Sequence, residues 1–514
     1  MLFNSYLFML VFLPATLGGY TLCGRFGRRA ATGWLVLCSI VFYGWWNVGY
    51  LALILGSTLV NYRLGKALAE TRSRAVLILG LTFNLGVLGW FKYAGLFSHT
   101  LASLTGLDGF VVTVALPLGI SFFTFQKIAY LVDCWRGETK PYDMLEFSLF
   151  VLFFPQLIAG PIIHHAEFLP QYQARKAGLD AENVSVGLTL FIAGLFKKVV
   201  IAEAMARYAS PMFDGAAAGD PITFLEAWPG ALAYTLQIYF DFSGYSDMAI
   251  GLARMFGLRF PVNFNSPYKA TSIIDFWRRW HITLSRFLRD YLYFPLGGNR
   301  HGESRRMVNL MVVMLLGGLW HGANWTFAVW GGLHGIYLMI NHGWRMLVER
   351  TGWRMPGPAF PYRALGWLVT FVAVMLAWVF FRAASFEAAL NIFKGMVAAE
   401  GRLVVTPGLQ SVARILAPVL GPATVNAGQS LPYFLGFHQL AVTLLVLALA
   451  LVLPNTQEWL HAHQPALGER PTPGLLARIG AWSPNIAWAV VMIVVGCVAF
   501  IQSMQPVEFI YWQF

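Results

Sequence analysis

The chain has 514 residues, of which 57% are hydrophobic and only 12% are charged. A water-soluble fold of this size lacks the polar surface to cover so many apolar side chains, since soluble domains carry roughly 25% charged residues. The composition therefore excludes soluble enzymes, disordered proteins and fibrous proteins, and it predicts an all-α polytopic integral membrane protein.

The formal net charge is +12 at pH 7. In a membrane protein, basic residues gather in cytoplasmic loops and meet anionic lipid, so this excess does not indicate nucleic-acid binding. The 4 cysteines are scattered, without a CxxC pair or a His/Cys ligand spacing. Neither a disulfide framework nor a metal site is predicted from them.

The first basic residue, Arg25, follows an apolar run that already fills a membrane span. We therefore expect a retained helix in place of a cleaved signal peptide, with an outside N-terminus and a cytoplasmic first loop. Apolar runs of sufficient length predict about eleven transmembrane helices. The candidate spans in chain order are 5–23, 31–47, 50–62, 76–97, 110–132, 147–163, 184–205, 224–256, 308–340, 365–381, 435–453 and 486–501.

The segment 237–248 places Asp241, Ser243 and Asp247 in a hydrophobic setting. Charges inside a membrane need partners, and Lys197 and Lys198 lie in another predicted span, so buried ion pairing is one interpretation. The alternative is a role in substrate positioning or proton relay.

The run from 275 to 292 places aromatic and aliphatic side chains on one face of a predicted helix and arginines on the other. Such a helix lies in the plane of the membrane interface. Its arginines, including Arg278, Arg279 and Arg286, either anchor lipid headgroups or bind a phosphate-rich ligand such as coenzyme A. His281 is expected at the edge between the two faces, where a structural role and a functional role are both open.

His321 lies within the apolar stretch 315–335. An ionisable side chain at membrane depth is costly, so it marks a functional site by default, although a hydrogen-bonded core histidine is the alternative. Asn324, at i+3, is expected to share a helix face with His321 and to fix its tautomer. His334 is about 20 Å further along an unbroken helix and is not expected to touch His321 unless nearby glycines break that helix.

The sequence lacks the motifs of several common catalytic mechanisms. The sequence contains no GxSxG nucleophile elbow, no GxxxxGK[ST] phosphate loop and no HExxH zinc motif. Neither His321 nor His334 begins an HxxxxD pattern. The mechanism that remains uses an intramembrane histidine as a base, beside a basic element at the membrane interface.

Three motifs carry a resemblance: Trp320-His-Gly, the run 276–285, and Arg289-Asp-Tyr-Leu-Tyr. Together they resemble the membrane-bound O-acyltransferase (MBOAT) family, and closely its bacterial alginate-acetylating branch. The matches extend from the N-terminus to about residue 345, with supporting runs at 117–125, 154–161, 239–251, 261–268 and 295–300.

This resemblance implies a catalytic core of transmembrane, interfacial and re-entrant helices around a central tunnel over residues 1–398. A connecting loop would cover 399–434, and C-terminal helices 435–514. The catalytic histidine maps onto His321, with His281 as the second family histidine and Trp320 beside it. His281 or Asn324 would orient the acceptor hydroxyl or stabilise the thioester oxyanion.

The resemblance also implies a bacterial inner-membrane O-acetyltransferase with no bound cofactor. The donor would be cytoplasmic acetyl-CoA or another acetyl thioester, docked by Arg278, Arg279 and Arg286. The acceptor would be an extracytoplasmic polysaccharide hydroxyl, reached with periplasmic acetyltransferase partner proteins. Alginate, cellulose, another exopolysaccharide and peptidoglycan all remain open as acceptors.

Two other function classes remain. One is a transporter or flippase, in which Asp241, Asp247 and His321 form a proton-coupled pathway. The other is a non-catalytic subunit of a polysaccharide export complex, in which the histidines would be replaceable.

Overall fold

The computed structural model describes residues 1–504, apart from 108, 110, 140, 353–358, 400–403, 406–423, 426–430 and 469–472. Helices dominate this part of the chain, and two two-residue strands, β1 (Val404–Val405) and β2 (Thr424–Val425), pair in parallel. The α-helices are α1 (Leu13–Gly24), α2 (Arg28–Gly44), α3 (Gly49–Thr71), α4 (Arg74–Leu88), α5 (Ala94–Thr105), α6 (Ile120–Arg136), α7 (Met144–Leu152), α8 (Phe154–Leu157), α9 (His165–Ala174), α10 (Ala181–Phe196), α11 (Glu203–Ala218), α12 (Phe224–Met255), α13 (Ile273–Arg279), α14 (Ile282–Leu288), α15 (Gly302–His321), α16 (Trp325–Thr351), α17 (Ala359–Arg382), α18 (Phe386–Met396), α20 (Phe437–Val452), α21 (Thr456–Trp459), α22 (Leu475–Ile479) and α23 (Ile486–Gln502). Short π and 3-10 turns are η1 (Phe8–Phe12), η2 (Gly89–Tyr93), η4 (Lys197–Ala202), η5 (Pro267–Lys269), η6 (Arg289–Tyr293) and η9 (His461–His463).

Within the described residues, three helical stretches are long and apolar enough to cross a membrane: Arg74–Thr105, Ala181–Ala218 and Phe360–Arg382. Shorter apolar helices are Phe8–Gly24, Phe437–Val452 and Ile486–Gln502. The prediction of a helical membrane protein is confirmed, whereas the expected count of about eleven spans is not.

Two expected spans are interrupted in the structure. The apolar run 147–163 forms α7 and α8, which are separated at Phe153. The run 308–340 forms α15 and α16, with a turn between His321 and Trp325. The run 224–256, in contrast, is the single helix α12. Hydropathy alone does not locate such breaks, because the turn residues are themselves uncharged.

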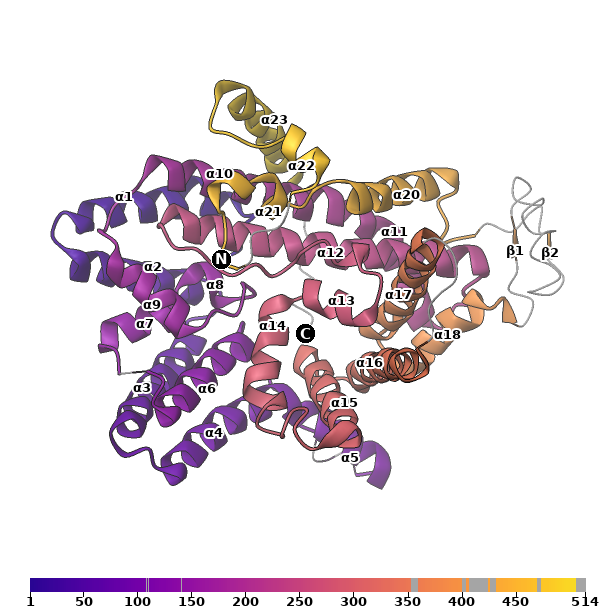
Figure 1. Ribbon diagram of the computed structural model, residues 1–514, viewed down its shortest axis with the longest axis horizontal. Helices are drawn as coiled ribbons and strands as arrows, with labels where there is room; N and C mark the ends of the chain where they lie inside the picture. Colours follow the sequence, from indigo (N-terminus) through magenta and orange to yellow (C-terminus); the bar gives the residue numbers. More distant parts are fainter. Residues whose placement is uncertain are drawn as a thin grey trace.

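Helix α12 crosses the middle of the molecule, with α10 and α11 alongside it (Figure 1). A capping box at its start joins Thr223 and Glu226, and nearly every residue from Glu226 to Met255 is buried. A helix that is buried on all sides belongs to the interior of a large fold. It therefore forms a fixed support for the helices that carry the polar side chains.

Glycines allow two helix pairs to touch through their backbones. A Cβ added to Gly187 on α10 would lie 2.5 Å from the carbonyl oxygen of Gly251 on α12. A Cβ on Gly318 of α15 would lie 2.3 Å from the carbonyl oxygen of Phe327, and one on Gly331 of α16 would lie equally close to a carbonyl of α15. Small residues permit this close approach of membrane helices. The crossing of α15 and α16 is thereby fixed at the end that carries His321.

The buried hydrophobic side chains form two clusters. Trp320 belongs to the first cluster, which is built mainly from the N-terminal helices α1–α10. Trp280 and Trp330 belong to the second, which includes α11, α12, α16 and α17. Helices α13, α14 and α15 lie between these two parts (Figure 1). The predicted histidines are carried by these central elements.

Candidate functional site

His281 occupies a break between two short helices. The run 275–292 is not one continuous interfacial helix, as the sequence predicted, because α13 ends at Arg279 and α14 begins at Ile282. His281 has a left-handed φ of 43° and is fully buried, so its expected position at the edge between two helix faces is wrong. A non-glycine residue in this conformation costs about 1–3 kcal/mol and is held by its surroundings.

Asn263 holds His281 in one tautomer. Its side-chain oxygen accepts hydrogen bonds from the backbone N–H and the hydroxyl of Thr283, at 3.3 and 2.9 Å, and its amide nitrogen donates to Ser246. The same oxygen is 3.2 Å from Nδ1 of His281, which must therefore donate. The lone pair of neutral His281 is then on Nε2, a buried atom with no hydrogen-bond partner in the described part of the chain.

His321 is buried at the last position of α15, and its ring centroid lies 6.1 Å from that of His281. Aromatic rings enclose it: Trp330 at 5.2 Å, Phe381 at 5.3 Å and the neighbouring Trp320 at 5.0 Å. The structure thus brings together the two histidines that the sequence singled out. An imidazole enclosed in this way is screened from bulk water.

The turn after His321 changes the positions of two predicted neighbours. Asn324 caps α16, accepting a hydrogen bond from the Thr326 N–H at 3.1 Å and donating to the Ala384 carbonyl at 3.0 Å. The helix face that Asn324 was expected to share with His321 does not exist, because α15 ends at His321. The same break brings His334 closer to His321 than an unbroken helix would, since the Trp330 ring lies 5.2 Å from the ring of His321 and 4.9 Å from that of His334.

Lys92 is a residue of this site that the sequence analysis did not identify. It lies in η2, within the apolar stretch Arg74–Thr105, and its amine is buried. The amine donates to the carbonyl of Trp320, to the carbonyl of His321 at 3.3 Å and to the hydroxyl of Ser121 at 3.3 Å. Lys92 therefore caps the end of α15 that carries His321. A lone lysine inside an apolar span was the available signal.

The carboxylates of α12 form ion pairs with η4. Asp241 contacts the amine of Lys198, and Asp247 lies 2.6 Å from the amine of Lys197. Asp247 also accepts a hydrogen bond from the hydroxyl of Thr456 at 2.8 Å. Buried ion pairing, one of the two interpretations of this segment, is what the structure contains. Ser243 is buried on the same helix.

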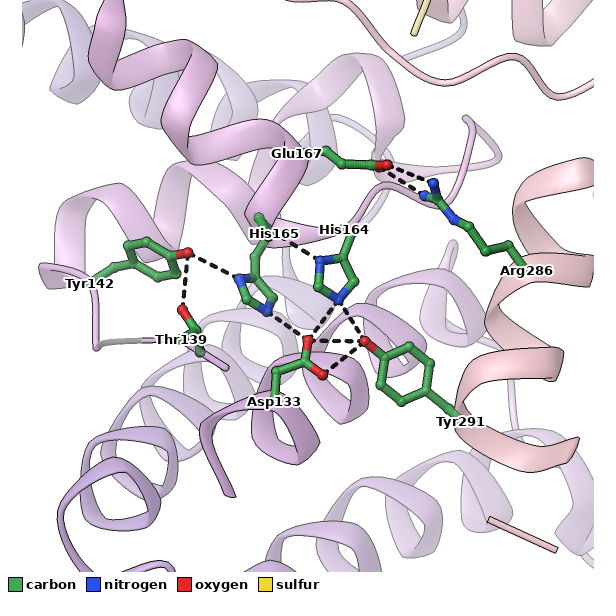
Figure 2. A network of polar contacts seen from close by, with 9 residues as sticks. Asp133, Thr139, Tyr142, His164, His165, Glu167, Arg286 and Tyr291 are labelled. Carbon is green, nitrogen blue, oxygen red and sulfur yellow. Dashed lines mark hydrogen bonds and ion pairs between the residues drawn. The ribbon is translucent and has the colours of Figure 1, made fainter. Parts of the chain in front are cut away.

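The three arginines expected to bind a donor have different surroundings. Arg279 is 2.9 Å from Asp275, and Arg286 binds both oxygens of Glu167 at 2.6 and 2.8 Å (Figure 2). Arg278 instead lines a cavity of 510 Å³. The other basic residues of that cavity are Arg289, Arg306 and His342.

His342 receives a hydrogen bond from Arg306, whose Nη2 is 2.6 Å from its Nδ1. Burial, followed by the charges of Arg306 and Arg345, lowers the pKa of His342. The ring is therefore neutral at pH 7 and accepts from Arg306. A second cavity of 540 Å³, which contains Arg136 and Arg300, shares Phe294 and Asn299 with the first, so the two adjoin.

Figure 2 also shows a polar cluster around Asp133, which lies beyond the predicted span 110–132. Burial alone would raise the pKa of Asp133, but hydrogen bonds from His164 and His165 outweigh it and hold that pKa well below its usual range. Burial also lowers the pKa of His165, against the opposing effect of Asp133. Asp133 is therefore ionised and His165 neutral at pH 7.

Comparison with known proteins shows the family of this chain. Residues 69–387 match the family model described as MBOAT, membrane-bound O-acyltransferase family. A peptidoglycan O-acetyltransferase of Helicobacter pylori is 44% identical over 78% of this chain and 80% of its own length. A probable alginate O-acetylase AlgI of Pseudomonas aeruginosa is 45% identical over 77% of this chain and 75% of its own.

A teichoic acid D-alanyltransferase of Streptococcus thermophilus is more distant, with 29% identity over 51% of this chain and 68% of its own length. The family match covers the elements that carry Lys92, His281 and His321. The chain therefore belongs to the membrane-bound O-acyltransferase family, and it is an acyltransferase of the same class as the O-acetyltransferases named above.

Proposed function

We propose that this protein transfers an acetyl group from a cytoplasmic thioester, acetyl-CoA, toward a hydroxyl group of an extracytoplasmic polysaccharide, across the inner membrane of a bacterium. The observation that carries the proposal is the pair of buried imidazoles, His281 and His321, whose centroids lie 6.1 Å apart within aromatic walls. A hydroxyl group is a poor nucleophile, and a positioned neutral imidazole increases its reactivity, typically by 10²–10⁴-fold.

In the proposed reaction, His321 accepts the proton of the acceptor hydroxyl as its oxygen attacks the thioester carbonyl carbon. A carbon–oxygen bond forms, the carbon–sulfur bond breaks, and the proton passes from His321 to the departing thiolate. His281 cannot donate to the oxyanion in the tautomer that Asn263 holds, because its Nε2 carries a lone pair. Its role in the proposal is to accept a hydrogen bond that orients His321 or the hydroxyl.

Support for the donor comes from the cavity lined by Arg278, Arg289 and Arg306. Guanidinium groups bind phosphate oxygens bidentately, which suits the phosphates of coenzyme A. Arg279 and Arg286 are already engaged by carboxylates, and so are Arg289 and Arg306, so the proposal assigns the main donor contact to Arg278.

Support for a polysaccharide acceptor comes from the relatives, whose names specify alginate or peptidoglycan. Both are polymers of sugars with free hydroxyl groups, and our proposal is an alginate-like acceptor. Final delivery to the polymer would involve a periplasmic acetyltransferase partner. Ion-paired Asp241 and Asp247 have a structural role in this scheme, which disfavours the proton-coupled transport pathway that they would otherwise form.

The test compares O-acetyl esters in extracellular polysaccharide from cells that carry the wild-type protein, His321→Ala or the exposed control His99→Ala. Membrane levels of the three proteins must match, because a folding defect would imitate lost chemistry. Loss of acetyl esters in His321→Ala alone, at normal polymer yield, is the expected result. Full acetylation in that variant would refute His321 as the base, and lost polymer secretion would favour a transport function.

A further inference from the structure

Two adjacent histidines and an aspartate meet at one point away from the imidazole pair. Asp133 comes from the end of α6, and His164 and His165 from the start of α9. The Nε2 atoms of His164 and His165 lie 2.6 and 2.8 Å from the same oxygen of Asp133. One ligand atom from each of the three residues lies within 4.8 Å of the others. Figure 2 shows both rings directed at this carboxylate.

A fourth oxygen completes the cluster. The hydroxyl of Tyr291, from η6, is 2.6 Å from Nε2 of His164 and 2.9 Å from the Asp133 oxygen that the histidines share. Two imidazole nitrogens, a carboxylate and a further oxygen form the kind of donor set that zinc takes in proteins. We propose that His164, His165 and Asp133 bind a divalent cation of the zinc class, with Tyr291 or water in the fourth position.

The surroundings of His165 support a metal ligand. Its other nitrogen, Nδ1, is 3.0 Å from the hydroxyl of Tyr142, which itself receives a hydrogen bond from Thr139 at 3.1 Å. Metal-bound histidines almost always donate their second N–H to such an oxygen, which fixes the ring. In the bound state Nδ1 carries the proton, and Nε2 offers its lone pair to the ion. The proton moves within the ring, and none is lost.

Binding requires small movements. The nitrogen–oxygen distances of 2.6 and 2.8 Å suit hydrogen bonds, whereas ligand atoms around tetrahedral zinc stand about 3.3 Å apart. His164 must also give up a 3.3 Å contact between its Nδ1 and the N–H of Ala166, so that this nitrogen can carry its proton. The side chain of His164 is 28% exposed, which leaves the ion a route of entry and lets water replace that contact.

The charged groups near the cluster are mixed in their effect on a divalent ion. Asp133 supplies one negative charge, and Glu138 lies close enough to His165 to act on it electrostatically. Arg136 opposes the ion, because its guanidinium lies 5.7 Å from the centre of the Tyr291 ring. Bound metal would join α6, α9 and η6 beside the cavity that Tyr291 and Arg136 line. The role that follows is a structural clamp, which is independent of the acetyl-transfer proposal.

The experiment uses the full-length protein in lipid nanodiscs, with its purification tag removed and bound metal stripped by a chelator. Co²⁺ is titrated into the sample, and its visible ligand-field bands are followed before displacement by Zn²⁺. We expect one saturable equivalent with the band intensity of a four-coordinate site. Asp133→Asn and His165→Gln should weaken binding at least tenfold, whereas His99→Ala, an exposed histidine on α5, should leave it unchanged.

Tyr142→Phe is the decisive variant because it retains the ring and removes only the oxygen that faces His165. We expect its affinity for Co²⁺ to fall 10–100-fold while the protein remains folded. The proposal is overturned if the wild-type protein takes up no saturable equivalent of Co²⁺ or Zn²⁺. Equal affinity in the wild type, Asp133→Asn and Tyr142→Phe would overturn it as well, since the metal would then bind elsewhere.

Discussion

Lys92→Met tests whether the end of α15 must be held for His321 to act. Methionine has a similar length and is apolar, so it fills the same space without donating to the carbonyls of Trp320 and His321. Each buried carbonyl left without a partner costs about 1–3 kcal/mol, which gives roughly 2–6 kcal/mol for the two. Removing a buried amine that needed desolvation offsets part of this cost.

The expected effect of Lys92→Met on the reaction rate follows from the position of His321. Relaxation of the turn that moves His321 by about 1 Å would lower the rate about 10²-fold. We therefore expect kcat to fall by about that factor while KM for acetyl-CoA changes little, because Lys92 is not among the residues of the arginine-lined cavity. The assay is release of coenzyme A from acetyl-CoA by protein in nanodiscs, with an alginate acceptor supplied to take the acetyl group. Lys66→Met, at an exposed lysine of α3, is the matched control.

Two results would refute this reasoning. If Lys92→Met kept more than half of the wild-type kcat, the carbonyl contacts would not position His321. If KM rose while kcat stayed constant, Lys92 would act on donor binding instead. Rescue of kcat by Lys92→Arg, which restores a donor, would support the positioning role, although the larger guanidinium has to fit the same enclosed site.

Replacing Arg278 with alanine should raise KM for acetyl-CoA about tenfold or more and leave kcat nearly unchanged, as measured by initial rates of coenzyme A release. Glu167→Gln should lower the thermal unfolding midpoint, because Arg286 loses its carboxylate partner; the discounted cost of this partly exposed pair is about 1 kcal/mol. His342 has a lowered pKa, so the stability it contributes is present above the ordinary histidine value and is lost as the pH falls through its lowered pKa. The fall in unfolding midpoint from pH 7 to 5 should therefore be smaller in His342→Gln than in the wild type, and an identical fall would contradict the assignment.

The class of fold was predictable from composition and His321 from a local signal, whereas His281 was singled out by the motif resemblance. The structure brings the two histidines together, and their catalytic roles stay predictions. An ionisable residue in an apolar run marks His321 on its own. The breaks in the helices were not predictable in this way. His281 adopts a left-handed conformation, and its ring contacts Asn263, which lies 18 residues earlier and meets it only in the folded chain. For Asn324 the sequence predicted a contact that the fold does not contain. Residues at i and i+3 share a helix face only along an unbroken helix, and α15 ends at His321.

The long-range pairs were the other features that sequence could not supply. Lys92 contacts carbonyls that follow it by more than 220 positions, and Asp133 meets His164 and His165 across a separate helix. Adjacent histidines after an apolar run were a visible pattern, but the carboxylate that completes the cluster was not. The predicted connecting loop 399–434 lies largely outside the described residues, so that boundary remains a prediction.

The backbone contact between α15 and α16 limits how this enzyme can be re-engineered. Any side chain at Gly318 or Gly331 would separate the two helices and shift His321 with them. Libraries that seek a larger acyl donor should therefore keep both glycines and vary Phe381 or Trp330, whose rings form the walls around the imidazole. A smaller side chain at Phe381 or Trp330 would widen the space around the imidazole, whereas separating α15 from α16 would displace His321 itself.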